Sequence, residues 1–382
     1  MYYPVIILSI SSLLAIGSFA QESDGQSTNG NDRIEQLNTA DSLSKVISDK
    51  VKKQAITSTV VIRTGTGGGS GFVVEDKGRK FVITNQHVLL GAQKLNIKIT
   101  TTDGSILQPI ALQIVPKLDL ARIEVKEAPP ALLFAISATI DDAVATVGNS
   151  LDAGVITVNT GNIKGVGNEE IEVDCESVPG QSGGPLVNSA GKVIGVTTYI
   201  LYADKDRATE DTRYAKKRYF TVRVSADTPW ASVRSWDEYA KVGLIVQSGE
   251  DVFEEALKIA ASADGGPDED YEYAGKNSRL TDAVKHHNIF VQKMMKMDGD
   301  VVTSTELERN NSSLSTSFRS VYKAIINACD GEQLAIQRDI DTGRTKFYPW
   351  HFERSKENIE MLAELSKFLN SRSKARPKFL SW

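Results

Sequence analysis

Short β-branched segments separated by Gly, Asn and Asp run from about Ser58 to Val224, and they are the strongest constraint that the sequence places on the fold. Almost no helical periodicity interrupts them. Many short strands at close spacing are typical of an all-β barrel or sandwich. We therefore expect an all-β domain with strands at Thr59–Arg63, Ser70–Val74, Lys80–Thr84, Leu95–Thr100, Leu120–Val125, Ala143–Val147, Val193–Tyr199 and Tyr219–Val224. The charged stretch 203–218 has no apolar anchors, and we expect an exposed loop there.

The regions on either side have a different texture. Residues 1–20 contain an uncharged apolar run that ends in a small-x-small pattern, which predicts a signal peptide and export to the periplasm or the medium. An uncleaved anchor is the alternative; no other stretch is long enough to span a membrane. Residues 21–57 combine a polar leader with an amphipathic helix over about Asp32–Ile56, and the β-domain then occupies 58–226. Residues 227–382 predict a smaller, mostly α-helical region of unknown role, with helices near Val252–Ser262, Ser278–Met297, Ser315–Ala328 and Ser355–Leu369.

Composition removes several classes of function. The 382 residues include 44 Lys and Arg against 49 Asp and Glu, so the chain lacks the excess of basic residues expected of a nucleic-acid-binding protein. His286 and His287 are adjacent on a predicted helix, where they point about 100° apart and cannot share one metal ion. We therefore expect no metal and no cofactor. Cys175 and Cys329 show no spacing signature; two separate buried thiols are expected, with a disulfide as the alternative.

The glycine-rich segment Pro179–Leu186 is the strongest local signal for chemistry, because it places Ser182 in a sharp turn before a strand. The N–H groups of Gly180 and Ser182 can converge there on one oxygen, as in an oxyanion hole, although a glycine-rich turn is common in any β protein. A serine hydroxyl needs a base to become a nucleophile. His87, which follows an apolar strand, is the one histidine between Gln21 and Lys285. Its alternative role is purely structural.

The acid that orients the histidine should be buried and attached to rigid structure. Asp103 lies in a turn signal, and the doublet Asp141–Asp142 is expected to be solvated. Asp119 differs because it lies inside the apolar run Leu118–Ala121, and a buried carboxylate requires a partner. We therefore assign Asp119 as the residue that orients His87.

The order His87, Asp119, Ser182 is that of the chymotrypsin-like proteases. With the segments Gly69–Val74, Ile83–Val88, Gly180–Asn188 and Gly191–Val196, these residues resemble the trypsin-like serine protease domain of the HtrA/DegP type. The resemblance covers about residues 58–224. It implies a double β-barrel of two six-stranded barrels, with His87 and Asp119 in the first barrel and Ser182 in the second. It also implies a serine endopeptidase that cleaves protein or peptide substrates through an acyl-enzyme.

Some positions depart from the relatives. Digestive trypsins carry an Asp before the serine for activation by a new N-terminus, whereas this chain has Gln181, so that zymogen switch is unavailable. HtrA proteins usually continue into PDZ domains, which the helical texture after Thr228 does not resemble. Capture of substrate and control of a homo-oligomer by such domains are therefore not expected, and homo-oligomerisation itself stays open. A catalytically silent protease fold that docks a partner through its helical region is the alternative function.

Specificity rests on three candidate substrate-binding residues. Glu176 lies six residues before Ser182, where this fold places the floor of the P1 pocket, and a carboxylate there favours Lys or Arg in the substrate. The alternative is that the loop turns Glu176 outward. Thr197 and Thr198, in the strand that follows the serine turn, are the other two.

Overall fold

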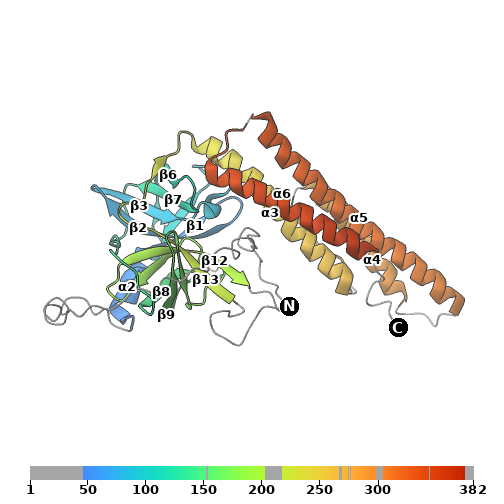
Figure 1. The fold of residues 1–382 in the computed structure, drawn as a ribbon, viewed down its shortest axis with the longest axis horizontal. Coiled ribbons are helices and arrows are strands. Elements are labelled where there is room, and N and C mark those ends of the chain that lie inside the picture. The colour runs from blue at the N-terminus through green and yellow to red at the C-terminus, as the bar shows by residue number, and fades with distance from the viewer. Residues whose placement is uncertain are drawn as a thin grey trace, which may run out of the picture. The chain divides into compact units, whose positions relative to one another are not determined.

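The computed structural model describes residues 46–151, 154–202, 217–265, 269–273, 275, 277–297, 304–343 and 345–374. The chain divides into two compact units, of which the first ends at Gly243 and the second begins at Leu244. Figure 1 shows that the first unit is built from strands and the second from helices. The expected signal peptide, the polar leader and most of the 203–218 loop lie outside the described residues. Among the described helices, none combines the length and the apolar character that a membrane crossing requires.

The first half of the β-unit is an eight-stranded antiparallel sheet in the order β14-β6-β7-β3-β2-β1-β4-β5. The strand expected from Leu95 begins only at Lys98, because the residues before it form a turn in which Leu95 is exposed. The strands are β1 (Thr59–Arg63), β2 (Gly68–Asp76), β3 (Arg79–Thr84), β4 (Lys98–Thr101), β5 (Ile106–Leu107), β6 (Pro109–Val115), β7 (Leu120–Val125) and β14 (Ala231–Ser232).

The second half is a closed antiparallel barrel of six strands in the order β10-β13-β12-β11-β8-β9. Its strands are β8 (Ala143–Asn149), β9 (Ile156–Val166), β10 (Glu170–Val173), β11 (Pro185–Asn188), β12 (Val193–Tyr202) and β13 (Lys217–Arg223). The expected double barrel is therefore confirmed, with one correction: the first half pairs as an eight-stranded sheet, and only the second is a closed six-stranded barrel. The sequence did not predict β9, because its eleven residues include two glycines and two asparagines, which are typical of a loop.

One apolar core joins both halves of the β-unit. Phe72 and Phe81 from the first sheet pack in the same cluster as Val187 and Val196 from the barrel, and all four are fully buried. Helix α2 (Asp49–Ser58) covers part of this cluster with Ile47, Val51 and Ala55. The hydroxyl of Ser48 caps α2 by accepting from the N–H of Val51 at 3.4 Å. The described part of the expected Asp32–Ile56 helix is thus helical only from Asp49 onward, and Val46 before it is exposed.

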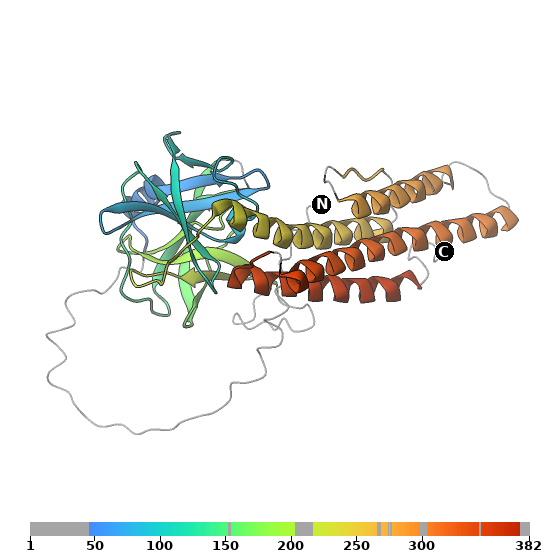
Figure 2. The same ribbon diagram turned by 90° about the horizontal axis from the view of Figure 1, so that it is seen from above.

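The helical region contains α3 (Trp236–Gly265), α4 (Ser278–Met297), α5 (Ser304–Thr342) and α6 (Pro349–Ser373). The expected stripe on α5 is buried and forms the centre of a single core: Phe318, Val321, Tyr322 and Ile325 are each at most 1% exposed. Helix α5 packs against α4 and α6, and the helices run side by side in Figure 2. The four predicted helices are confirmed, but α3 and α5 are much longer than expected.

The first two turns of α3 belong to the β-unit, as does the segment before them. Strand β14 pairs with β6, and the indole N–H of Trp236 donates to the carbonyl of Ala92 at 2.7 Å. The helical unit therefore begins at Leu244, not at residue 227, because a strand pairing and a buried tryptophan hold residues 231–243 on the β-unit.

The two cysteines are separate, buried and free, each in the core of its own unit. Burial raises the pKa of each thiol, Cys175 and Cys329, to about 12. At pH 8 the folded protein should therefore show almost no reaction with a thiol reagent. In denaturant, where the pKa returns to about 8.5, both thiols should react. A titration with Ellman's reagent under native and denaturing conditions checks this, and recovery of fewer than two thiols in denaturant without reductant would contradict it.

Candidate active site

His87 begins a short 3-10 helix, η2 (His87–Leu89), directly after strand β3. Its backbone N–H donates to one carboxylate oxygen of Asp119 (Oδ1, 3.0 Å), and its ring Nδ1 lies 2.6 Å from the other (Oδ2). The side chains of His87 and Asp119 are 23% and 15% exposed. The expected pair is thus in direct contact, and both carboxylate oxygens are used in holding it.

This contact selects the tautomer of the imidazole. A carboxylate can only accept, so the Nδ1 atom of His87 carries the proton that it donates to Asp119. In a neutral imidazole, the second nitrogen, Nε2, then has a free electron pair. His87 is therefore prepared to accept a proton at Nε2, and the adjacent carboxylate of Asp119 stabilises the positive charge that results.

Asn85 links this pair to the opposite side of the site. Its side-chain N–H₂ donates to the carbonyl of Asp119 at 2.7 Å and to the hydroxyl of Thr198 at 3.2 Å. Asp119 lies between β6 and β7 of the first sheet, whereas Thr198 lies on β12 of the barrel. The fully buried Asn85 therefore ties the acid to the strand behind the serine.

The serine turn, which we define as Gly180–Gly183, has a backbone conformation that requires glycine at two positions. Gly183 has φ +86°, and a Cβ there would lie 2.0 Å from the carbonyl oxygen of Ser70. Gly180 likewise has φ +91°. Within the described part of the chain, the N–H groups of Gly180 and Ser182 donate to no acceptor, while those of Gln181 and Gly183 do. Two donors are thus left in the turn where an oxyanion hole was expected.

The side chain of Gln181 is fully buried and supports this turn through hydrogen bonds. Its Oε1 accepts from the N–H of Val178 at 3.0 Å and from Asn159 at 3.3 Å, and its Nε2 donates to the hydroxyl of Thr157 at 2.8 Å. Thr157 and Asn159 both lie on β9. A neutral carboxamide with three hydrogen bonds thus holds the turn with no need of a charged partner.

Ser70, on β2, connects the first sheet to the turn that carries Ser182, and its N–H, hydroxyl and carbonyl are all hydrogen-bonded. The N–H of Ser70 donates to the carbonyl of Ser182 at 2.8 Å. The hydroxyl of Ser70 donates to the carbonyl of Gly180 at 2.8 Å and accepts from the N–H of Asn149 at 2.7 Å. Its carbonyl accepts from the hydroxyl of Thr84 at 2.7 Å. Both ends of the Gly180–Ser182 segment are therefore held by one buried residue.

The hydroxyl of Ser182 donates to the carbonyl of Thr198 at 3.4 Å. The structure thus brings His87 and Asp119 together. Ser182 contacts Thr198 on β12, the same residue whose hydroxyl is hydrogen-bonded to Asn85. Catalytic hydrogen bonds are often long or absent without substrate and form only in its complex.

The three expected substrate-binding residues have different surroundings. Glu176 is exposed, and its carbonyl accepts from the side chain of Asn159 at 2.5 Å. Thr197 and Thr198 are 5% and 8% exposed, and the backbone of Thr197 exchanges hydrogen bonds with Gly183 and Gly184. Both threonines are therefore buried against the turn that carries Ser182.

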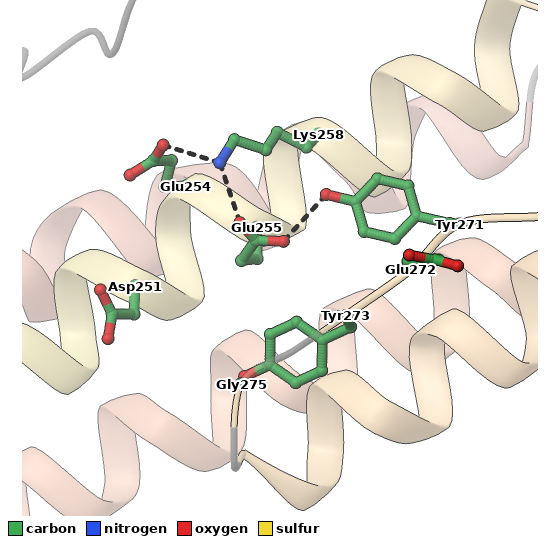
Figure 3. A pocket seen from close by; sticks show the side chains of 8 residues that line it. All are labelled: Asp251, Glu254, Glu255, Lys258, Tyr271, Glu272, Tyr273 and Gly275. Atoms are coloured by element: carbon green, nitrogen blue, oxygen red, sulfur yellow. Dashed lines mark hydrogen bonds and ion pairs between the residues drawn. The ribbon is translucent and has the colours of Figure 1, made fainter. Parts of the chain in front are cut away.

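The helical unit has its own cavity of about 470 Å³, which is open and mostly acidic (Figure 3). Its lining comprises Asp251, Glu254, Glu255, Lys258, Tyr271, Glu272, Tyr273 and Gly275. Lys258 pairs with Glu254 and Glu255 at 2.8 Å, and the hydroxyl of Tyr271 donates to Glu255 at 2.8 Å. Burial and this carboxylate raise the pKa of Tyr271. Lys258 and Tyr271 are thus bound to carboxylates of the cavity itself.

The other histidines belong to the helical unit. His287 is fully buried and lies 2.9 Å from the hydroxyl of Ser262 and 3.0 Å from the carbonyl oxygen of the Asn288 side chain. Burial lowers the pKa of His287. His286 is 39% exposed and lies 3.9 Å from Asp282. The described residues contain no group of three or more potential ligands that could hold a metal ion.

Sequence reasoning missed the residues that support the site. Asn85, Gln86 and Ser70 enter the sequence analysis only as members of the motif segments Ile83–Val88 and Gly69–Val74. The available signal was the pair of carboxamides between an apolar strand and His87. Burying such side chains is costly unless they are hydrogen-bonded, which predicts that they hold neighbouring backbone.

Comparison with known proteins agrees with this geometry. Residues 69–196 match the family model of the trypsin-like peptidase domain. A probable periplasmic serine endoprotease of the DegP type from Chlamydia trachomatis is 36% identical over 145 residues, which are 35% of this chain and 28% of that protein. Serine protease HTRA1A of Danio rerio is 29% identical over 253 residues, 56% of this chain and 50% of that protein. The chain thus resembles the HtrA/DegP proteases in its β-unit and spans half or less of the length of these relatives.

Solved structures give a partial match as well. The serine endoprotease from Yersinia pestis is 24% identical, with a TM-score of 0.36 over 46% of this chain and 61% of that one. The inactive form of the Rv3671c protease of M. tuberculosis, as a Ser-to-Ala mutant, is 22% identical with a TM-score of 0.38 over 47% of this chain. The double barrel is established by the strand order itself, and no part of the site is inferred from these structures.

Ser70→Ala should lower the free energy of unfolding by about 1–3 kcal/mol, because it removes the hydroxyl that donates to the carbonyl of Gly180 and accepts from the N–H of Asn149. Ser232→Ala, on the exposed end of β14, is the matched control and should change it by less than about 0.5 kcal/mol. Urea unfolding curves measure both values. Equal midpoints for Ser70→Ala and the parent protein would contradict the assignment.

Proposed function

We propose that this chain is an exported serine endopeptidase of the HtrA/DegP type, with His87, Asp119 and Ser182 as its triad. The observation that carries the proposal is the contact between His87 Nδ1 and Asp119 at 2.6 Å, which leaves Nε2 as a base. The match of residues 69–196 to the trypsin-like peptidase domain supports the same conclusion. An endopeptidase acts on protein or peptide substrates, and no metal or cofactor is needed for this chemistry.

The reaction begins with a rotation of the Ser182 hydroxyl. It leaves the carbonyl of Thr198, where its hydrogen bond is long, and turns to the Nε2 atom of His87. His87 removes the hydroxyl proton as Oγ forms a bond to the carbonyl carbon of the substrate. The negative charge that develops on the carbonyl oxygen is held by the N–H groups of Gly180 and Ser182, which have no acceptor within the described residues.

The tetrahedral intermediate collapses to an acyl-enzyme: the imidazolium of His87 gives its proton to the leaving amine, the peptide bond breaks, and the acyl group remains on Ser182. A water molecule, deprotonated by His87, then attacks the acyl carbon and forms a second tetrahedral intermediate. As this intermediate collapses, His87 returns the proton to the Oγ atom of Ser182, the ester bond breaks, and the carboxylic acid is released. Asp119 stays ionised throughout and stabilises the charge on His87 through the hydrogen bond at Nδ1.

Activation by a new N-terminus is not part of this mechanism. Gln181 replaces the acidic residue that such activation needs, and its hydrogen bonds to Val178, Asn159 and Thr157 already hold the turn. We therefore propose that the serine turn is formed without cleavage of the chain.

Export is supported by the apolar run within residues 1–20 and its small-x-small end. The Chlamydia trachomatis relative is described as periplasmic. We place the protein in the periplasm or outside the cell on these two grounds.

Ser182→Ala should abolish both proteolysis and labelling by a fluorophosphonate probe, because the nucleophile is lost. His87→Ala should lower kcat by a factor of about 10⁴ to 10⁶, because the base is lost. Ser232→Ala, an exposed serine on β14, should leave both unchanged. Labelling of the purified full chain and casein digestion measure these effects. A wild-type protein that is folded but never labelled would instead favour the silent binding protein that docks a partner through its helical region.

Glu176 should give a preference for Lys or Arg at P1, through attraction between its carboxylate and the cationic substrate side chain. Because Glu176 is exposed, the preference over a neutral residue should be modest, within about 10-fold. Glu176→Gln should remove it, whereas Glu169→Gln, an exposed carboxylate at the other end of β10, should not. Cleavage of a peptide library measures the P1 preference of each variant. Exclusive cleavage after aliphatic residues would contradict the proposed role of Glu176.

A further inference from the structure

Gln86 is a fully buried carboxamide that immediately precedes His87. Its Nε2 donates to the carbonyl of Leu118 at 2.7 Å and to that of Val115 at 3.1 Å. Both carbonyls belong to the turn that leads into Asp119. A buried carboxamide costs several kcal/mol unless it is hydrogen-bonded, so these bonds tie Gln86 firmly to that turn.

Together, Asn85 and Gln86 hold the backbone on both sides of Asp119. The carbonyl of Leu118, which Gln86 binds, belongs to the peptide bond that ends at the nitrogen of Asp119. The carbonyl of Asp119 itself, which Asn85 binds, belongs to the next peptide bond. Because two peptide planes determine the direction of the Cα–Cβ bond between them, the carboxylate of Asp119 is aimed by the two residues that precede His87.

Tyr239 completes this arrangement from helix α3. It is fully buried, and its hydroxyl donates to the Oε1 atom of Gln86 at 3.2 Å. Because Oε1 can only accept, the bond from Tyr239 fixes the orientation of the Gln86 carboxamide. Its Nε2 then faces the carbonyls of Val115 and Leu118. Without the tyrosine hydroxyl, Gln86 loses the partner that orients it.

Two further contacts bring the start of α3 close to the segment that follows His87. The indole of Trp236 donates to the carbonyl of Ala92, and a Cβ added at Gly243 would lie 2.7 Å from the nitrogen of Gly91. Three positions on one helix, Trp236, Tyr239 and Gly243, therefore contact residues 86–92.

From this geometry we propose that Gln86 and Tyr239 are positioning residues that hold His87 and Asp119 in register, and that helix α3 is thereby part of the support of the active site. The proposal rests on the proposed function only for its effect on catalysis. Its structural content is that the Nδ1 hydrogen bond of His87 depends on a residue of α3, outside the matched segment 69–196.

The test uses the full chain with Tyr239→Phe, which removes one hydroxyl, and Gln86→Met, which keeps the volume and removes all three hydrogen bonds. Tyr322→Phe is the matched control, because it removes a buried tyrosine hydroxyl from the helical unit, where it donates to Ala260 at 3.5 Å. The chain has four histidines, so the Nδ1 proton of His87 can be assigned in an NMR spectrum of protein labelled with [¹⁵N]histidine.

We expect kcat to fall about 5-fold in Tyr239→Phe, the equivalent of one hydrogen bond, and about 100-fold in Gln86→Met, with KM unchanged in both. The His87 Nδ1 proton should move upfield in both variants and stay in place in Tyr322→Phe. A merely structural role would lower the unfolding temperature while leaving this resonance and kcat unchanged.

The outcomes separate this proposal from the proposed function. Wild-type labelling that depends on Ser182, with an unchanged kcat and Nδ1 resonance in Tyr239→Phe, would overturn the positioning role and leave the protease assignment intact. A wild-type protein without activity would overturn the protease assignment, and the Nδ1 resonance of Tyr239→Phe would still decide the positioning role. If Gln86→Met fails to fold, Tyr239→Phe alone decides.

Discussion

Ser70 is the residue on which the relation between the two halves of the β-unit depends. It lies on β2 of the first sheet, yet its N–H and hydroxyl hold the carbonyls of Ser182 and Gly180 in the barrel. Asn85 makes the second connection, from Asp119 to Thr198. Apolar packing between the halves, through the shared core, is not directional and tolerates small shifts, whereas hydrogen bonds from fully buried groups tolerate few. The apolar core therefore brings the halves together, and these polar contacts determine their register to the precision that a reaction needs.

Much of the β-unit could be predicted from the sequence because its strands are β-branched and its histidines are scarce. The contact between His87 and Asp119 could be predicted, because His87 is the one histidine of this region of the sequence and a carboxylate buried in an apolar run requires a partner. The strands β9, β10 and β11 could not be predicted, since glycine, asparagine and glutamate obscure their alternation and they are held by neighbours distant in the sequence. For the same reason the supporting role of Gln181 was out of reach: its partners Thr157 and Asn159 lie on β9.

The helical region shows the opposite limitation. Its helices were located from apolar spacing, but α5 extends from Ser304 to Thr342 although only its middle has a clear stripe. Buried polar contacts, which no periodicity reveals, connect the rest of the helices: Arg354 binds Glu250 and Glu357, and the hydroxyl of Ser248 donates to Glu332 at 2.6 Å. The start of the unit was misplaced for a related reason. Nothing in the sequence near residue 227 reveals that Trp236 and Tyr239 have partners in the segment around His87.

The arrangement around His87 also bears on the choice between an enzyme and a silent scaffold. A scaffold gains stability from apolar burial and has no need to bury two neighbouring carboxamides, because burying such polar groups costs free energy unless they are hydrogen-bonded. Here both are fully buried, and their hydrogen bonds go to the backbone on either side of one aspartate. In a scaffold, apolar residues throughout this turn would achieve the same burial without any polar partners to satisfy. What such residues would not supply is the direction of a carboxylate, and direction matters chiefly when a proton must be held on one nitrogen of His87 and accepted by the other.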